Sequence, residues 1–278
     1  MELEDVIIDL YLRIDGIYRE IVEGGRLRQR GFDPALSDAE LLTIEIFGEI
    51  QGYNGDRAIW RYSRTHWQHY FPRLGSYKCF AKHCANLCWI KEAILQRIFS
   101  GRDEDIHIID GVPMPVCHNA RAYRARMLSE ASAWGYCAAK DEHYYGIRGH
   151  VVLGLNGLIS AVIISPANRD ERSSLHHLKG WIKGMLIGDK GFISEDLRKE
   201  MADCGIDLQT PKRANMHDER PKQTVQRLMH VRKRVETAIG SLLEHFHLAK
   251  IKAHDQWHFL SKLYRKILAY NFSVMMKS

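Results

Sequence analysis

Three acidic residues of the 278-residue chain stand in segments that could deliver their carboxylates to one point: Asp110, Asp189 and Glu236. Asp110 ends the apolar run 106–109 and Asp189 ends the run 185–188, so both are predicted as strand-end carboxylates. Glu236 lies inside a long basic stretch with a helical pattern. Carboxylate oxygens are the ligands that Mg²⁺ and Mn²⁺ prefer. The pattern therefore indicates a metal-dependent site for phosphoryl transfer.

Each of these carboxylates also has an ordinary explanation. Asp110-Gly111 is a common turn pair, and Asp189 could simply terminate a strand. Glu236 could pair with Arg232 one turn earlier on a helix surface, for only about 0.2–0.5 kcal/mol. Glu244 is a rival for the role of third ligand, because it lies eight residues, or about two helical turns, beyond Glu236. The occurrence of all three together favours a shared site.

Basic side chains are grouped near these carboxylates in the sequence. The net charge of +6 favours polyanionic partners only weakly, so the placement of the charge carries more weight. Clustered Lys and Arg are what a phosphate backbone requires, whereas a solvated helix face is the ordinary alternative. The candidate DNA-binding residues are Arg121, Arg124, Lys212, Arg213, Arg232 and Lys233.

The elements that would position the carboxylates begin near residue 105. Asn156-Gly157 predicts a tight hairpin turn between two of the strands. Strands are expected at 106–110, 144–155, 158–165, 185–189 and 206–210, and helices at 172–183, 194–204, 223–247 and 257–275. This order predicts an α/β fold, a mixed sheet with helices on both faces.

The first hundred residues are expected to be helical. Apolar residues from Ile7 to Ile21 recur at spacings of three and four, and Ser37-x-x-Glu40 is a capping box that opens a second helix. Two further helices are expected at 60–70 and 76–99. These helices could form a helix-turn-helix reader of DNA or a purely structural bundle, and both interpretations remain open.

Composition limits the other possibilities. The 45% hydrophobic content suits a packed core, and six cysteines without a paired framework fit a reducing compartment. No secretory h-region or transmembrane run is visible, so a cytoplasmic protein is expected. A zinc site on Cys79, His83, Cys84 and Cys88 is disfavoured, because all four fall on one predicted helix. His150 could touch the acidic site or be a satisfied core histidine.

The chain resembles bacterial insertion-sequence transposases of the DDE type, which have an RNase-H-like catalytic core. The similarity is clear over about residues 105–275 and weaker over the N-terminal helices. The segments that carry it are 108–113 (Ile-Ile-Asp-Gly-Val-Pro), 145–150 (Tyr-Gly-Ile-Arg-Gly-His), 165–170 (Ser-Pro-Ala-Asn-Arg-Asp), 188–192 (Gly-Asp-Lys-Gly-Phe) and Arg232-x-x-x-Glu236-Thr237.

This resemblance implies that Asp110, Asp189 and Glu236 are the catalytic triad and bind two Mg²⁺ ions, for which Mn²⁺ can substitute in such enzymes. It implies an RNase-H-like domain at 105–278, including the C-terminal helix, preceded by a helical and possibly DNA-binding region at 1–100. The implied partners are double-stranded DNA, as element ends and target, and further copies of the chain. A nucleoid-associated location in a bacterial cytoplasm is implied with them.

The chain departs from the pattern of these relatives beside Glu236. In many of them the final carboxylate belongs to Tyr-x-x-Arg-x-x-x-Glu followed by a Lys. Arg232 matches this signature, but Met229 stands at the Tyr position and Leu243 at the Lys position. Lys250, or Lys212 with Arg213, could take the phosphate-binding role. Two other functions also remain open: a catalytically silent DNA-binding descendant, and an RNase-H-like nuclease that does not join strands.

Overall fold

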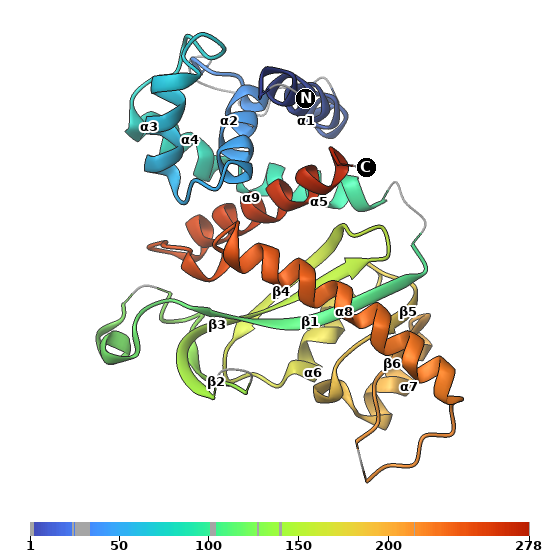
Figure 1. The fold of residues 1–278 in the computed structure, drawn as a ribbon. Coiled ribbons are helices and arrows are strands. Elements are labelled where there is room, and N and C mark those ends of the chain that lie inside the picture. Colours follow the sequence, from blue (N-terminus) through green and yellow to red (C-terminus); the bar gives the residue numbers. More distant parts are fainter. Residues whose placement is uncertain are drawn as a thin grey trace. The chain divides into compact units, whose positions relative to one another are not determined.

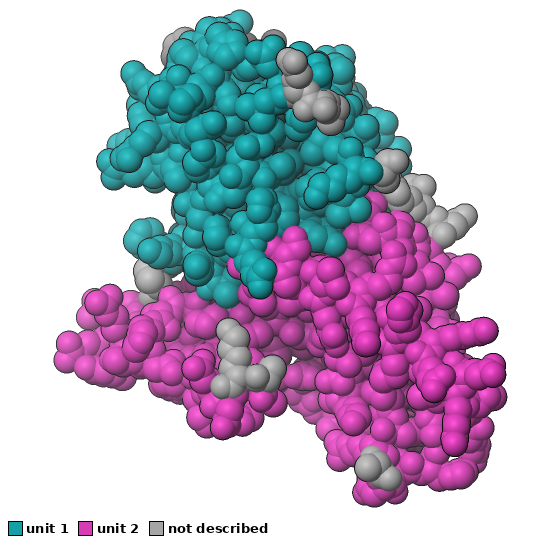
Figure 2. Space-filling model, in the orientation of Figure 1, with its two compact units in different colours: residues 1–100, 244–278 teal, residues 101–243 magenta. Residues whose placement is uncertain are grey.

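The computed structural model describes residues 3–23, 25, 34–100, 104–126, 128–138, 141–213 and 215–277. The chain divides into two compact units (Figure 2). The first, here called the helical unit, comprises residues 1–100 and 244–278, and the second, the sheet unit, comprises residues 101–243. The helical unit is therefore built from both ends of the chain.

The predicted N-terminal helices are present, with one change. The elements of the helical unit are α1 (Leu3–Val22), α2 (Asp38–Ile50), α3 (Asp56–His66), α4 (Tyr77–Asn86), α5 (Cys88–Ser100), the 3-10 helix η4 (Leu248–Lys250) and α9 (Gln256–Met275). The capping box at α2 is confirmed, because Ser37 accepts from the Glu40 N–H and Glu40 accepts from the Ser37 N–H. None of the helices in the described parts of the chain is long and apolar enough to span a membrane.

The single helix expected at 76–99 is wrong, because the chain breaks at Leu87 into α4 and α5. A helix end leaves backbone carbonyls without helical partners. Here the carbonyl of Cys84 accepts from Lys91 Nζ at 2.9 Å and from Ser261 Oγ at 3.0 Å. Side chains from α5 and α9 therefore stabilise the break, and a partner so distant in sequence could not be recognised from residues 76–99 alone.

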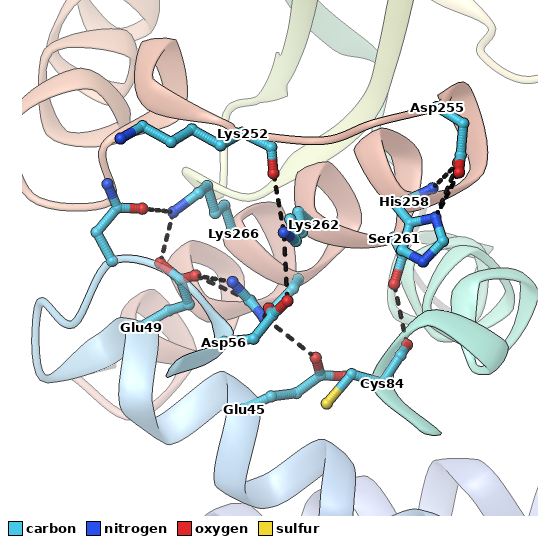
Figure 3. Close-up of polar contacts among 12 residues, drawn as sticks. Glu45, Glu49, Asp56, Cys84, Lys252, Asp255, His258, Ser261, Lys262 and Lys266 are labelled. Carbon is cyan, nitrogen blue, oxygen red and sulfur yellow. Dashed lines mark hydrogen bonds and ion pairs between the residues drawn. The ribbon is translucent and has the colours of Figure 1, made fainter. Parts of the chain in front are cut away.

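A charged cluster lies in the core of the helical unit, between α2 and α9. Glu45 and Glu49 of α2 are fully buried, and Arg265 and Lys266 of α9 are 1% exposed. Figure 3 shows these acidic side chains facing basic ones from α9. The ion pairs are Lys91–Glu45 at 2.7 Å, Arg265–Glu49 at 2.7 Å, Arg265–Asp56 at 2.6 Å, Lys266–Glu49 at 2.8 Å and Lys262–Asp56 at 3.2 Å.

The pairing in this cluster keeps Asp56 ionised. Burial alone would raise the pKa of the Asp56 carboxyl, but Arg265 and Lys262 outweigh burial and hold that pKa well below its usual range. Buried charges are tolerated only when each is matched by an opposite charge and by hydrogen bonds. The α2–α9 cluster supplies an opposite charge for each buried acid, so it fixes how the two ends of the chain pack within the helical unit.

The sheet unit has the mixed sheet that the sequence predicts. Its elements are β1 (Ile106–Pro115), η1 (Asn119–Arg124), β2 (Ala133–Cys137), β3 (Glu142–Gly154), β4 (Ile159–Pro166), α6 (Glu171–Ser174), η2 (Leu175–Leu178), β5 (Gly184–Ile187), η3 (Lys190–Phe192), α7 (Glu195–Asp203), β6 (Ile206–Gln209) and α8 (Lys222–Glu244). The strand order is β2-β3-β1-β5-β6, and β4 also pairs with β3. β1, β3 and β4 pair antiparallel, whereas β1, β5 and β6 run parallel. The RNase-H-like fold class is thus confirmed.

The strand that carries Asp110 is longer than expected, so the prediction that Asp110 ends it is wrong. β1 continues through Pro113 and Pro115, paired with β3 along its length. The N–H of Val116 donates to the Tyr145 carbonyl, so the alternating N–H positions of residues 113 and 115 face away from β3. Proline lacks an N–H and is accepted on such an unpaired edge.

Other differences are local. The helix expected at 172–183 is wrong, since α6 is one turn long and η2 follows it before Gly180 takes a φ of +80°. Strand β2 was not expected at all. The hairpin turn at Asn156-Gly157 is confirmed, with Gly157 at φ +82° and the Gly154 N–H donating to the Leu158 carbonyl. The C-terminal helix, which the sequence analysis placed with the catalytic region, packs in the helical unit.

We predict that Lys91→Met lowers the free energy of unfolding by about 3 kcal/mol, because the buried Glu45 carboxylate loses its nearest cation at 2.7 Å and keeps only Arg265 at 3.5 Å. Arg97→Met is the matched control, since the Arg97–Glu20 pair is 52% and 57% exposed and should contribute about 1 kcal/mol at most. Urea unfolding followed by circular dichroism measures both. Equal, small losses in the two variants would contradict a structural role for the buried pair.

Candidate active site

The register of the sheet brings Asp110 and Asp189 together. Parallel pairing of β1 with β5 ends at Ile108 opposite Ile187. Asp110 and Asp189 each lie two residues beyond that pair, on neighbouring chains. Side chains two apart on a strand share a face, so both carboxylates leave the sheet on the same side. The two carboxylates therefore converge, Asp110 from within β1 and Asp189 from just after β5.

Helix α8 delivers the third carboxylate to this face. It crosses one side of the sheet (Figure 1), and its residue Arg232 contacts all three acidic side chains. The guanidinium lies 3.5 Å from Asp110 Oδ2, 3.6 Å from Asp189 Oδ1 and 3.5 Å from Glu236 Oε1. Three carboxylates from three elements thus surround one cationic group. We call these four residues the carboxylate cluster.

The three carboxylates differ in exposure. Asp110 is 22% exposed, Asp189 44% and Glu236 52%, so Asp110 is the most enclosed of them. Burial raises the pKa of Asp110, and the negative charges of Asp189 and Glu236 raise it further, against the Gly111 N–H and Arg232, which lower it. The Gly111 N–H donates to Asp110 Oδ1 at 2.8 Å. A cation at this point would stabilise the ionised form.

The chemistry of the donor set fits a hard divalent cation, because all three groups offer carboxylate oxygens to one point. Among the described residues, no three His, Cys, Asp or Glu side chains are arranged to hold a metal ion as they stand. In the carboxylate cluster the guanidinium of Arg232 occupies the point of convergence. The cluster is thus an acidic site with a cation already inside it, supplied by the protein.

The loop that carries Asp189 is packed against the opposite face of the sheet. Residues 110 and 111 face opposite sides of the sheet, and His150 is paired with Gly111, so its ring lies on the side away from the Asp110 carboxylate. There it contacts the Phe192 ring edge-on, with ring centroids 5.9 Å apart. His150 is buried, and burial lowers its pKa to about 4. Its ring is therefore a neutral support for the loop rather than a group facing the carboxylates.

Gly188 and Gly191 allow close packing on either side of Asp189. A Cβ on Gly188 would lie 2.9 Å from the Phe192 ring, and one on Gly191 would lie 2.5 Å from Glu171 Oε2. Glu171 in turn accepts from Arg148 at 2.7 Å. Sequence reasoning did not assign a role to Glu171. Its position directly after the segment 165–170, which carries part of the resemblance, is the signal that could have identified it.

The candidate DNA-binding residues do not form one cluster in the structure. Arg232 joins the carboxylates, Lys233 is exposed beside it on α8, and Lys212 and Arg213 follow β6. Arg121 and Arg124 are exposed on η1, where the Arg124 guanidinium lies over the Tyr123 ring at 4.9 Å. Only Arg232 among the six contacts the acidic residues in the described interactions.

Lys212 lines a polar cavity of about 380 Å³ at the end of β6. Arg198 and His217 also line it and were not recognised from the sequence, because they lie far from Lys212 along the chain or in a loop without a pattern. Arg220 is fixed at its wall by hydrogen bonds to Asp218, Gln209 and the Thr210 carbonyl. The cavity adds positive and polar groups near the carboxyl ends of the parallel strands.

Other candidate groups lie outside the carboxylate cluster. Glu244 is the last residue of α8 and groups with the helical unit, whereas the other carboxylates belong to the sheet unit. His83, a candidate zinc ligand, contacts the Asp38 carboxylate at 2.5 Å. Burial raises the pKa of the Cys84 thiol, and it raises that of Cys88 to about 11. Protonated thiols are poor metal ligands.

Comparison with known proteins agrees with this geometry. A family model described as "Transposase DDE domain" matches residues 100–255, more than half of the chain. The chain belongs to this transposase family. The matched range includes Asp110, Asp189 and Glu236. A bacterial insertion-sequence origin, which the sequence analysis also expected, stays a prediction.

A solved structure shows the same fold. The cryo-EM structure of a piggyBac transposase synaptic complex with hairpin DNA is similar with a TM-score of 0.54, over 97% of this chain and 72% of that chain, at 10% sequence identity. At this identity the similarity establishes the fold and nothing finer. A comparison with curated proteins finds no match. The family assignment therefore rests on the match over residues 100–255.

We predict that Gly188→Ala displaces the Asp189 loop of the DDE domain. The added methyl group would lie 2.9 Å from the ring of Phe192, which is 1% exposed, so a loss of about 1–3 kcal/mol in unfolding free energy is expected. Gly240→Ala on α8 is the matched control, because nothing lies within 4 Å of its Cβ position and Ala favours a helix. Urea unfolding compares them. Equal stability of the two variants would contradict the packing argument.

Proposed function

We propose that this transposase-family chain cleaves DNA at the ends of its insertion sequence and joins the freed 3′-hydroxyl groups to target DNA. The observation that carries the proposal is the convergence of Asp110, Asp189 and Glu236, from β1, the end of β5 and α8, within a DDE transposase domain. Such a triad is the arrangement expected for phosphoryl transfer assisted by divalent cations.

In the proposed reaction, water first attacks the phosphodiester at an element end, and the bond from phosphorus to the 3′-oxygen breaks to leave a free 3′-hydroxyl. That hydroxyl then attacks a phosphodiester of the target, so one bond to phosphorus forms as another breaks. Two Mg²⁺ ions, or Mn²⁺, would supply activation of the attacking oxygen and charge stabilisation of the leaving one. No covalent link between protein and DNA is needed.

The residues of the cluster have distinct tasks in this proposal. Asp110, the most enclosed carboxylate, would serve both cations, while Asp189 and Glu236 would each hold one. Packing of Phe192 and His150 behind the Asp189 loop fixes the position of that carboxylate. Arg232 is placed to neutralise charge beside them. The chain's own contribution is therefore to orient three oxygen donors on a rigid sheet and helix.

Double-stranded DNA is the inferred partner. The solved piggyBac complex contains hairpin DNA, and this chain carries exposed basic residues on η1, on α8 and after β6. Joining two element ends would require more than one copy of the chain, so a homo-oligomer on DNA is part of the proposal. The helical unit remains a candidate DNA reader, and a cytoplasmic, nucleoid-associated location is expected with it.

The first test is cleavage and strand transfer with Mg²⁺ or Mn²⁺ on DNA that carries the flanking sequences of the gene. We expect nicking at the element boundary and joined products. Three variants, Asp110→Asn, Asp189→Asn and Glu236→Gln, should each reduce the cleavage rate by about 10³-fold or more. In each, a neutral amide of similar shape replaces a charged carboxylate ligand. Asp207→Asn, on an exposed position of β6, is the control and should retain the rate.

Each other outcome would overturn a particular part of the proposal. Cleavage that survives Asp189→Asn would remove the triad assignment. Cleavage without joined products would indicate a nuclease of this fold, and DNA binding without cleavage would indicate a silent descendant.

A second test concerns the basic residues after β6. We predict that Lys212→Gln with Arg213→Gln makes the dependence of log K on log salt shallower by about 0.9 for each phosphate that the double variant no longer binds. Lys183→Gln is the matched control, because this exposed residue lies at the opposite end of β5 from Asp189. Binding to duplex DNA measured by fluorescence anisotropy across salt concentrations gives the slopes. Identical slopes in the double variant and the control would exclude phosphate binding by Lys212 and Arg213.

A further inference from the structure

Arg232 contacts three carboxylates but is tightly bound to none of them. Its distances to Asp110, Asp189 and Glu236 are 3.5–3.6 Å. Charge-assisted hydrogen bonds between a guanidinium and a carboxylate are normally about 2.7–2.9 Å long. In addition, the Nε of Arg232 is buried and has no hydrogen-bond partner in the described structure. The guanidinium is therefore shared loosely among its three neighbours.

Another arginine of the same unit shows what a permanently held guanidinium looks like. Arg220 donates to both oxygens of Asp218 at 2.8 Å, to Gln209 Oε1 at 2.8 Å and to the Thr210 carbonyl at 2.9 Å. Its Nε, Nη1 and Nη2 atoms all have partners at short distance. The two arginines have similar exposure, 22% and 19%, so burial does not explain the difference. The contacts of Arg232 are those of a group that can leave.

The charges of the cluster also favour an exchange. Three carboxylates against one guanidinium leave a local excess of two negative charges when all three are ionised. A divalent cation would balance this excess more fully than one guanidinium can, and Mg²⁺ holds its oxygen ligands at about 2.0–2.1 Å, much closer than the guanidinium lies.

We propose that Arg232 is a built-in counter-ion that competes with the divalent cation for Asp110, Asp189 and Glu236. Arg232 holds the three carboxylates near one another in the metal-free protein and leaves the point of convergence when the cation binds. The released side chain, on the part of α8 that also carries exposed Lys233 and Arg234, is then available to a DNA phosphate. This inference rests on the proposed metal-dependent function, since it concerns the same three ligands.

The competition has a measurable sign. Loss of Arg232 should strengthen binding of the cation, whereas a merely structural arginine would weaken it when removed. Mn²⁺ alone is the probe, and its free concentration is followed by electron paramagnetic resonance in the full-length protein without DNA. We expect Arg232→Gln to lower the Kd for Mn²⁺ by about 5-fold or more, the range typical of coupling between two ligands.

Two matched variants separate this effect from general electrostatics and from binding elsewhere. Arg234→Gln removes the same charge from an exposed position on the same helix, and should leave the Kd for Mn²⁺ close to that of the unaltered protein. Asp189→Asn removes a ligand and should abolish the tight site. The Arg232 effect is specific if it exceeds that of Arg234 and disappears in the presence of Asp189→Asn.

Thermal unfolding provides a second readout. Without metal, Arg232→Gln leaves three carboxylates crowded without their counter-ion, so its melting temperature should fall below that of the unaltered protein. Saturating Mn²⁺ should raise the melting temperature of this variant more than that of the unaltered protein, because tighter binding to the folded state adds more stability. Arg234→Gln should show neither change.

The alternative results have separate meanings. Equal or weaker Mn²⁺ binding by Arg232→Gln, with binding still dependent on Asp189, would overturn the counter-ion role and leave the metal site standing. Absence of Asp189-dependent Mn²⁺ binding in every variant would overturn the metal site of the proposed function, and the counter-ion role with it.

Discussion

Mutual repulsion among three carboxylates is the constraint on which the sheet unit is built. Asp110, Asp189 and Glu236 come from the middle of a strand, the loop after a second strand and a helix far along the chain. The register of β1 with β5 and the ion pairs to Arg232 bring them together. Like charges at this spacing are unfavourable unless a cation lies among them. Arg232 supplies that cation from α8, so the helix that brings the third carboxylate also offsets the cost of bringing it.

The helical unit meets a similar problem in a different way. Its buried acids Glu45 and Glu49 and the half-buried Asp56 have basic partners at 2.6–2.8 Å. Arg265, the basic residue that contacts both Glu49 and Asp56, is 1% exposed. Ion pairs that are this short and this buried hold their side chains in fixed positions, and removal of one partner lowers the stability of the fold strongly. The 3.5–3.6 Å contacts of Arg232 are looser and partly solvated. The same chain thus has one ionic cluster suited to holding a fold and one suited to exchange.

Much of the fold follows from local patterns. Helical periodicity, a capping box and an Asn-Gly turn predict α1, α2 and the β3–β4 hairpin, since each depends on residues adjacent in sequence. Features that depend on distant partners were missed. The break at Leu87 is stabilised by Ser261 and Lys91 around the Cys84 carbonyl, and β1 extends past Asp110 because β3 pairs with it. Nothing in the local pattern of α2 marks Glu49 as the partner of buried cations, because Arg265 and Lys266 lie more than two hundred residues later.

The candidate site shows the same division. The three carboxylates could be recognised from strand-end and helical positions together with a family resemblance, whereas the central place of Arg232 required the packing of α8 on the sheet. Because the chain departs from the Tyr-x-x-Arg-x-x-x-Glu signature at two positions, more depends on the position of Arg232 among the three carboxylates. Leu243 stands where many relatives have a lysine, and Met229 where many have a tyrosine, so these two positions of α8 lack polar groups that could assist a phosphate. Arg232 is the cationic residue of the signature that remains. In the proposed exchange it would neutralise the three carboxylates until the cation binds, and would then contact a DNA phosphate.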